Sequence, residues 1–168
     1  ANEFPGNRLL FEYLFGWMVD LLGIEKTIFI GRLFNFALLA IPLASLFRIL
    51  KLSNAEIFIL LQTYLLTSQN FYAGEWIFKG MEAKTFAYVF VFGGLLEFLK
   101  SKYIKAMILI MVATWFHILI GGWFAICCFI VLLLQKIHWK DFFKLGFLYG
   151  IPLLPLLYYL STNLLIET

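Results

Sequence analysis

Charged residues are scarce in this sequence. Lys, Arg, Asp and Glu make up 14% of the 168 residues, whereas 63% are hydrophobic and 20% are aromatic. A soluble domain carries about 25% charged residues and about 45–50% apolar residues. The apolar excess is larger than one buried core requires, so the composition argues against a soluble domain and predicts a polytopic membrane protein.

Several other features are missing as well. The apolar segments lack a polar–apolar alternation of period two, which favours helices as the spanning elements. The two cysteines, Cys127 and Cys128, are neighbours in an apolar run and match neither a zinc spacing nor a disulfide framework. The formal net charge is +3 without a basic stripe, so we expect no nucleic-acid partner.

The chain begins with Ala1-Asn2-Glu3 rather than Met, and no basic segment followed by a short apolar core marks a signal peptide. We therefore expect one membrane domain over residues 1–168 that is a piece of a longer protein, with the rest of that protein as its partner. Residues 1–26 are expected to form an outer loop and an interfacial helix, and residues 27–160 the transmembrane helices.

The apolar runs predict an all-α bundle of about six transmembrane helices plus one interfacial helix. Leu9–Leu22 would rise only about 21 Å, short of a hydrocarbon core of about 30 Å, so we assign it to the membrane surface, with its aromatic residues among the headgroups. Within the first span we interpret Arg32 and Asn35 as packing residues. The first three expected spans are Thr27–Leu50, a helix that is capped by Ser53-Asn54 and runs to about Ser68, and Thr85–Leu99. Two short helices follow within Ile104–Leu134 and are joined at Gly121-Gly122. The last span is Phe143–Leu160, which follows a polar turn at Gln135–Lys144 and is interrupted by Pro152 and Pro155.

The expected loops alternate in charge. The positive-inside rule assigns the more basic set to the cytoplasm. Residues 1–26, residues 69–84, the Gly121-Gly122 turn and the C-terminus then face outward. The basic set consists of Arg48, Lys51, Lys100, Lys102, Lys105, Lys136, Lys140 and Lys144.

Polar chemistry is concentrated in two patches. Glu75, Lys79, Glu82 and Lys84 fall within ten residues between apolar segments, and His117 lies four residues before the predicted outer turn. An ionisable group at membrane depth is costly and commonly marks a site. We expect both patches to meet on the outer side of the membrane.

More than one interpretation fits these residues. Glu82 and Lys84 open a predicted helix, where they either cap the helix and pair with each other or help to bind a phosphate. Glu75 and Glu82 are alternative candidates for a general base and a ligand of a divalent metal ion. His117 is either part of a site or a buried imidazole bonded to a backbone carbonyl or to Thr114.

One family combines such patches. The segment Gly80–Tyr88, a span, a basic turn, a span that ends Trp115-Phe116-His117 and a glycine turn together resemble the core of bacterial GT-C glycosyltransferases. The interfacial helix is also similar, and the resemblance covers about Asn7 to Leu134.

The resemblance implies transfer of a sugar from a polyprenyl-phosphate donor on the outer side of the bacterial inner membrane, with inversion of the stereochemistry of the transferred sugar. It makes Glu82, His117 and Glu75 catalytic candidates. The candidates for binding the donor phosphate are Lys84, Lys79 and Arg8. The catalytic Asp of that family is expected upstream of Ala1.

Two alternatives stay open. A His in a Trp-rich apolar helix followed by glycines is also similar to membrane-bound O-acyltransferases, in which a buried His acts as a base. A non-enzymatic transporter or scaffold bundle would instead use helices broken at Pro42, Pro152 and Pro155 to line a path.

Overall fold

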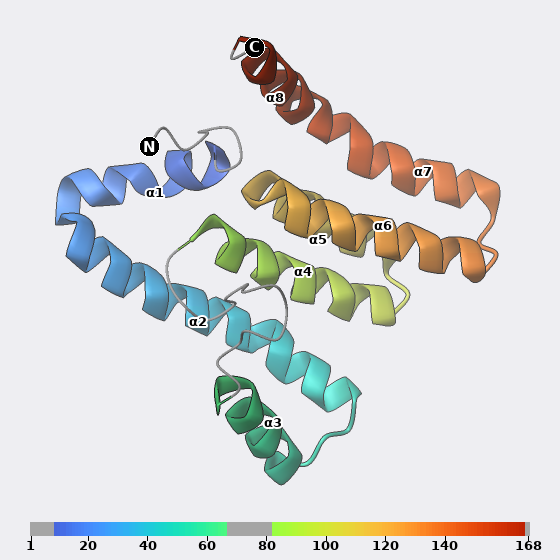
Figure 1. The fold of residues 1–168 in the computed structure, drawn as a ribbon. Helices are drawn as coiled ribbons and strands as arrows, with labels where there is room; N and C mark the ends of the chain where they lie inside the picture. Colours follow the sequence, from blue (N-terminus) through green and yellow to red (C-terminus); the bar gives the residue numbers. More distant parts are fainter. Residues whose placement is uncertain (1–8, 67–81, 167–168) are drawn as a thin grey trace.

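The computed structural model describes the backbone of residues 9–66 and 82–166, and side chains within residues 10–63 and 82–162. All regular structure in these ranges is helical (Figure 1), as predicted. The elements are α1 (Leu9–Leu22), α2 (Ile24–Ile49), α3 (Asn54–Leu66), α4 (Ala83–Leu99), α5 (Tyr103–Phe116), α6 (Ile118–Leu134), α7 (Trp139–Gly150), the 3₁₀ turn η2 (Ile151–Leu153) and α8 (Leu154–Ile166).

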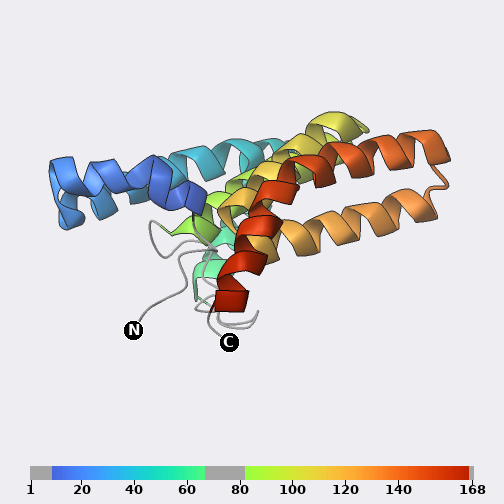
Figure 2. The same cartoon turned by 90° about the horizontal axis from the view of Figure 1, so that it is seen from above.

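Helix α5 is the centre of the bundle. It packs against α4, α6 and α7, while α2 lies along the other side of α4 (Figures 1 and 2). Ala106, Ile110 and Ala113 recur every three or four residues and are completely buried, because this spacing places them on one face of the helix. The central position therefore follows from an almost wholly apolar helix with small residues at its contacts.

Helices α4 and α5 form an antiparallel hairpin whose contact depends on small residues. A Cβ added to Gly94 would lie 2.8 Å from Ile110 Cγ1 and 3.4 Å from the Ala106 carbonyl oxygen. Ala87 on α4 is also completely buried. Small side chains let two helix backbones approach closely, which is the usual basis of helix association where both helices are apolar.

The predicted turn at Gly121-Gly122 is wrong. The chain turns at His117, whose extended backbone (φ −153°, ψ 106°) ends α5 and begins α6. Gly121 instead lies in the first turn of α6, where a Cβ would overlap the backbone of Thr114. The glycine is required by close helix packing rather than by a turn.

Pro42 does not break a helix, because it lies inside the continuous helix α2. The expected interruption of the last helical run is present at Pro152, which lies in the 3₁₀ turn η2 between α7 and α8, and Pro155 lies in the first turn of α8. A proline in the first positions of a helical turn removes an N–H that has no intrahelical partner there. The predicted polar turn at Gln135–Lys144 is also too long, because α7 begins at Trp139 with His138 as its N-cap.

Helix α1 forms over the predicted residues but packs differently from a helix that only lies on a surface. Gly23, at φ 78°, turns the chain from α1 into α2, and the Thr27 hydroxyl lies 2.8 Å from the Gly23 carbonyl oxygen. Tyr13 and Trp17 are exposed, whereas the ring of Phe15 packs on Phe86 of α4 at a centroid distance of 4.7 Å. The aromatic residues of α1 are thus divided between the surface and the bundle.

Two helical stretches in the described ranges are long and apolar enough to cross a membrane: Ile24–Ile49 and Trp139–Thr162. Helices α4, α5 and α6 have 17, 14 and 17 residues. A straight span requires about 20 residues. Length and composition thus support membrane association through α2 and the α7–α8 run.

A polar contact joins α5 to α7. The Thr114 hydroxyl donates to the Ile110 carbonyl oxygen at 2.9 Å and lies 2.9 Å from the Tyr149 hydroxyl. We expect Tyr149→Phe to lower the free energy of unfolding by about 1 kcal/mol, because one partly buried hydrogen bond is lost. Denaturant unfolding in detergent measures this, and Tyr158→Phe, which changes a hydroxyl on a 72% exposed side chain, should have no effect. Equal effects of the two variants would contradict the assignment.

Candidate functional site

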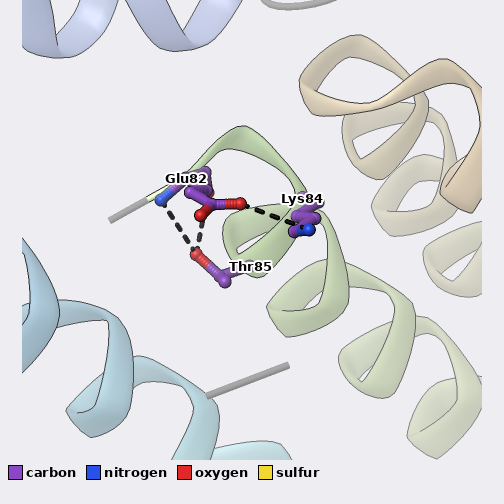
Figure 3. A network of polar contacts seen from close by, with 3 residues as sticks. All are labelled: Glu82, Lys84 and Thr85. Atoms are coloured by element: carbon purple, nitrogen blue, oxygen red, sulfur yellow. Dashed lines mark hydrogen bonds and ion pairs between the residues drawn. The ribbon is translucent and has the colours of Figure 1, made fainter. Parts of the chain in front are cut away.

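Glu82 and Lys84 begin helix α4, as predicted. Glu82 is the N-cap residue, and its Oε2 lies 3.3 Å from Lys84 Nζ (Figure 3). The Thr85 hydroxyl accepts a hydrogen bond from the Glu82 N–H at 3.3 Å and donates to the Glu82 carbonyl oxygen at 2.7 Å. The helix N-terminus favours the carboxylate, and Thr85 fixes the local backbone.

The Glu82–Lys84 ion pair is partly open to the surroundings. Its side chains are 42% and 22% exposed, respectively. An exposed pair contributes little to stability, about 0–1 kcal/mol. The carboxylate and the ammonium group can both be reached from the surroundings.

His117 lies at the junction of α5 and α6. Its Nδ1 accepts a hydrogen bond from the Ile120 N–H at 3.4 Å, so the ring caps the first turn of α6. In the neutral imidazole this arrangement places the proton on Nε2. The side chain is half-buried, and it combines a capping role with a proton-carrying nitrogen at the end of the bundle.

The two patches lie at the same end of the α4–α5 hairpin. Phe86, one turn into α4, stacks on Phe116, the residue before His117, at a centroid distance of 5.8 Å. Phe90 also stacks on Phe116, at 5.4 Å. Glu82 and Lys84 are therefore joined to His117 by one packed layer of aromatic rings.

Three of the predicted site residues, Glu75, Lys79 and Arg8, lie outside the described residues. Among the described residues, no group of three or more His, Cys, Asp or Glu side chains is arranged to hold a metal ion. Glu82 is instead paired with Lys84. In the described part of the chain, Glu82 therefore has an ion-pairing role and belongs to no metal-binding group of that size.

Sequence reasoning missed two polar features of the interior. It named Thr114 only as a partner for His117, whereas the Thr114 hydroxyl lies beside the Tyr149 hydroxyl. It interpreted Asn35 as a packing residue, and Asn35 is completely buried on α2. Neither polar atom of the Asn35 side chain has a hydrogen-bond partner among the described residues, so it does not join helices by hydrogen bonding. No spacing in the sequence could have indicated the Thr114–Tyr149 contact or the burial of Asn35.

The basic residues lie toward the opposite end of the bundle. The end of α2, the α4–α5 turn and the α6–α7 turn all point to one side in Figure 1. These segments, with the first turn of α5 and the first half of α7, carry every member of the basic set: Arg48, Lys51, Lys100, Lys102, Lys105, Lys136, Lys140 and Lys144. The fold therefore separates a lysine-rich end from the end with Glu82, Lys84 and His117.

Comparison with protein-family models, with curated proteins and with solved structures found no match to this chain. The functional argument therefore depends on the residues and their arrangement.

Proposed function

We propose that this chain is the helical membrane part of a GT-C-like glycosyltransferase, which transfers a sugar from a polyprenyl-phosphate donor. In this proposal Lys84 binds the donor phosphate, and Glu82 and His117 exchange protons with the acceptor or the leaving group. Glu75, Lys79 and Arg8 are further candidates, and the catalytic Asp is supplied by chain upstream of Ala1.

The observation that carries the proposal is the convergence of Glu82, Lys84 and His117 at one end of the α4–α5 hairpin. A carboxylate, an ammonium group and an imidazole are the groups needed for proton transfer beside a phosphate. The ring layer of Phe86 and Phe116 holds both helix ends together. A site built on the ends of rigid helices keeps its groups in a fixed geometry.

The exterior of the bundle supports the membrane setting of this proposal. Phe29, Leu33 and Ile41 on α2 are 65%, 55% and 66% exposed, and Leu134 on α6 is 76% exposed. Soluble proteins rarely expose apolar side chains so densely. In the proposal these residues contact lipid, and α3 to α6 complete a bundle of about six spans with α1 at the surface.

The charge asymmetry of the bundle supports an orientation. The lysine-rich end is assigned to the cytoplasm by the positive-inside rule. The end with Glu82, Lys84 and His117 then faces outward, where a polyprenyl-phosphate donor would present its sugar. Because α4 and α6 would rise only about 26 Å, less than a hydrocarbon core of about 30 Å, their ends lie just beneath the headgroup layer, where a side chain can reach a lipid phosphate.

Substitutions in the full-length protein test the proposal. With a panel of radiolabelled sugars on polyprenyl phosphate, we expect Glu82→Gln and His117→Ala to lower kcat about a hundredfold, because proton transfer is lost. Lys84→Ala should mainly raise KM for the donor, since it removes an ion pair to the phosphate. The assay measures transfer of label from the lipid to a water-soluble product or acceptor.

Lys26→Ala is the matched control, because Lys26 is an exposed lysine at the start of α2 outside the proposed site. It should leave both kinetic constants unchanged. Unaltered activity in all three site variants would show that the site is assigned wrongly. A wild-type protein inactive on every lipid-linked sugar, but able to transfer an acyl group to a hydroxyl acceptor, would favour the O-acyltransferase alternative.

A further inference from the structure

A charged cavity lies at the lysine-rich end, where the α4–α5 turn meets α7. Its volume is about 470 Å³, within the range of small-molecule sites. Lys102, the N-cap residue of α5, and Lys105 line it from one side, and Lys144 of α7 lines it from the other. Asp141 is the one acid among the lining residues, so the cavity has an excess of positive charge.

An apolar groove of about 550 Å³ lies between α2, α4 and α5. Pro42, Phe90, Gly93 and Leu109 are among its lining residues, and its one acid, Glu97, is paired with Lys100 at 3.3 Å. Gly93 adds no side chain to the groove on α4. Lys105 lines both this groove and the charged cavity. Lys105 therefore lies where the apolar groove and the charged cavity meet.

We propose that the two cavities together bind one anionic phospholipid. Its phosphodiester lies among Lys102, Lys105 and Lys144, and one acyl chain follows the groove over Gly93. The inference uses the membrane setting of the bundle but not its transferase activity, whose residues lie at the other end.

Charge and shape argue for this occupant over others. Basic pockets between helices near a membrane surface bind anionic headgroups, and each lysine contributes about fivefold in affinity. A free phosphate would use the charged cavity but leave the apolar groove empty. A zwitterionic lipid would fill the groove but bring its own cation to the lysines.

Competition between two lipids tests the proposal. The purified full chain in mild detergent is mixed with equal amounts of phosphatidylglycerol and phosphatidylcholine with identical acyl chains, and retained lipid is counted by native mass spectrometry. We expect phosphatidylglycerol to be retained about tenfold or more over phosphatidylcholine. The triple variant Lys102→Gln/Lys105→Gln/Lys144→Gln should abolish the preference, and Asp141→Asn should increase it about fivefold.

A triple variant of equal charge change is the control. Arg48→Gln/Lys136→Gln/Lys140→Gln removes three cations from the same end but none that lines either cavity. It should keep the preference for phosphatidylglycerol. Equal loss in both triple variants would show that only the overall charge of this end matters, and would overturn the proposal.

A groove variant and a soluble probe separate lipid from phosphate. A Cβ at Gly93 would lie 3.5 Å from Leu109 Cδ1, an ordinary contact, so Gly93→Leu should fold and fill the groove. We expect it to lower phosphatidylglycerol retention about tenfold. Glycerol phosphate, which has no acyl chain, should not displace the lipid at equal concentration. Displacement by glycerol phosphate, or full retention by Gly93→Leu, would contradict the groove as the acyl-chain site.

Discussion

Gly121→Ala is expected to lower the free energy of unfolding by about 3 kcal/mol or more. A Cβ at Gly121 would overlap the backbone nitrogen, the Cα and the hydroxyl oxygen of Thr114 on α5. Overpacking that forces side chains and backbone to shift costs about 1–3 kcal/mol and occasionally more, and here the overlap is with the backbone itself. Denaturant unfolding in detergent measures the change.

Gly122→Ala is the matched control for this prediction. A Cβ at Gly122 meets no atom within 4 Å, so the added methyl group is free of contacts. Replacing a helical glycine by alanine then stabilises by about 0.5–1 kcal/mol, and the two neighbouring variants should differ in sign. Truncating Thr114 in the double variant Gly121→Ala/Thr114→Ala should not restore stability, because the overlap includes its backbone. Similar stabilities of the two single variants would show that α6 does not approach α5 this closely.

Phe86→Ala is expected to destabilise the bundle by about 3 kcal/mol. Phe86 is 2% exposed, and its ring contacts Phe15, Phe34 and Phe116 at centroid distances of 4.7, 6.4 and 5.8 Å. Removing a buried phenyl ring leaves a cavity and forfeits its dispersion contacts. Because the ring joins α4 to α1, α2 and α5, we also expect faster hydrogen exchange in α1.

The control for Phe86 is Phe29→Ala, which removes the same ring from a side chain that is 65% exposed on α2. Its unfolding free energy in detergent should change by less than about 0.5 kcal/mol. If hydrogen exchange in α1 were unchanged in Phe86→Ala, the ring layer would not hold α1 on the bundle. The candidate site would then lack its proposed support.

Helix content and most helix positions could be predicted from the sequence, because apolar runs and caps are local signals. Glu82 as the start of α4 and Ser53 as the cap of α3 are examples: Ser53 and Glu56 form reciprocal hydrogen bonds at 2.7 and 3.3 Å. The turn between α5 and α6 could not be placed. A glycine such as Gly121 is equally expected in a turn and at a close contact between two helices. Only its packing against Thr114 shows that Gly121 serves the helix contact.

The candidate site, too, could be predicted in part from local sequence signals, whereas other parts depended on tertiary packing. The sequence predicted that Glu82, Lys84 and His117 belong to one end of the bundle, because helix lengths and alternating loops determine the end at which each helix terminates. Lys102, Lys105 and Lys144 were predicted to share the other end by the same reasoning. That Lys105 also lines an apolar groove, and that Tyr149 lies beside Thr114, required the packing of α5 against three other helices.

The sequence by itself determined an all-helical, strongly apolar chain with its charges separated between two ends, since composition and periodicity act within single segments. The tertiary structure decided which glycines are contacts, which prolines are tolerated inside helical runs, and which polar groups meet. These outcomes depend on the distance between backbones that are far apart in the sequence. That distance is set by how side chains from several helices fill one shared volume.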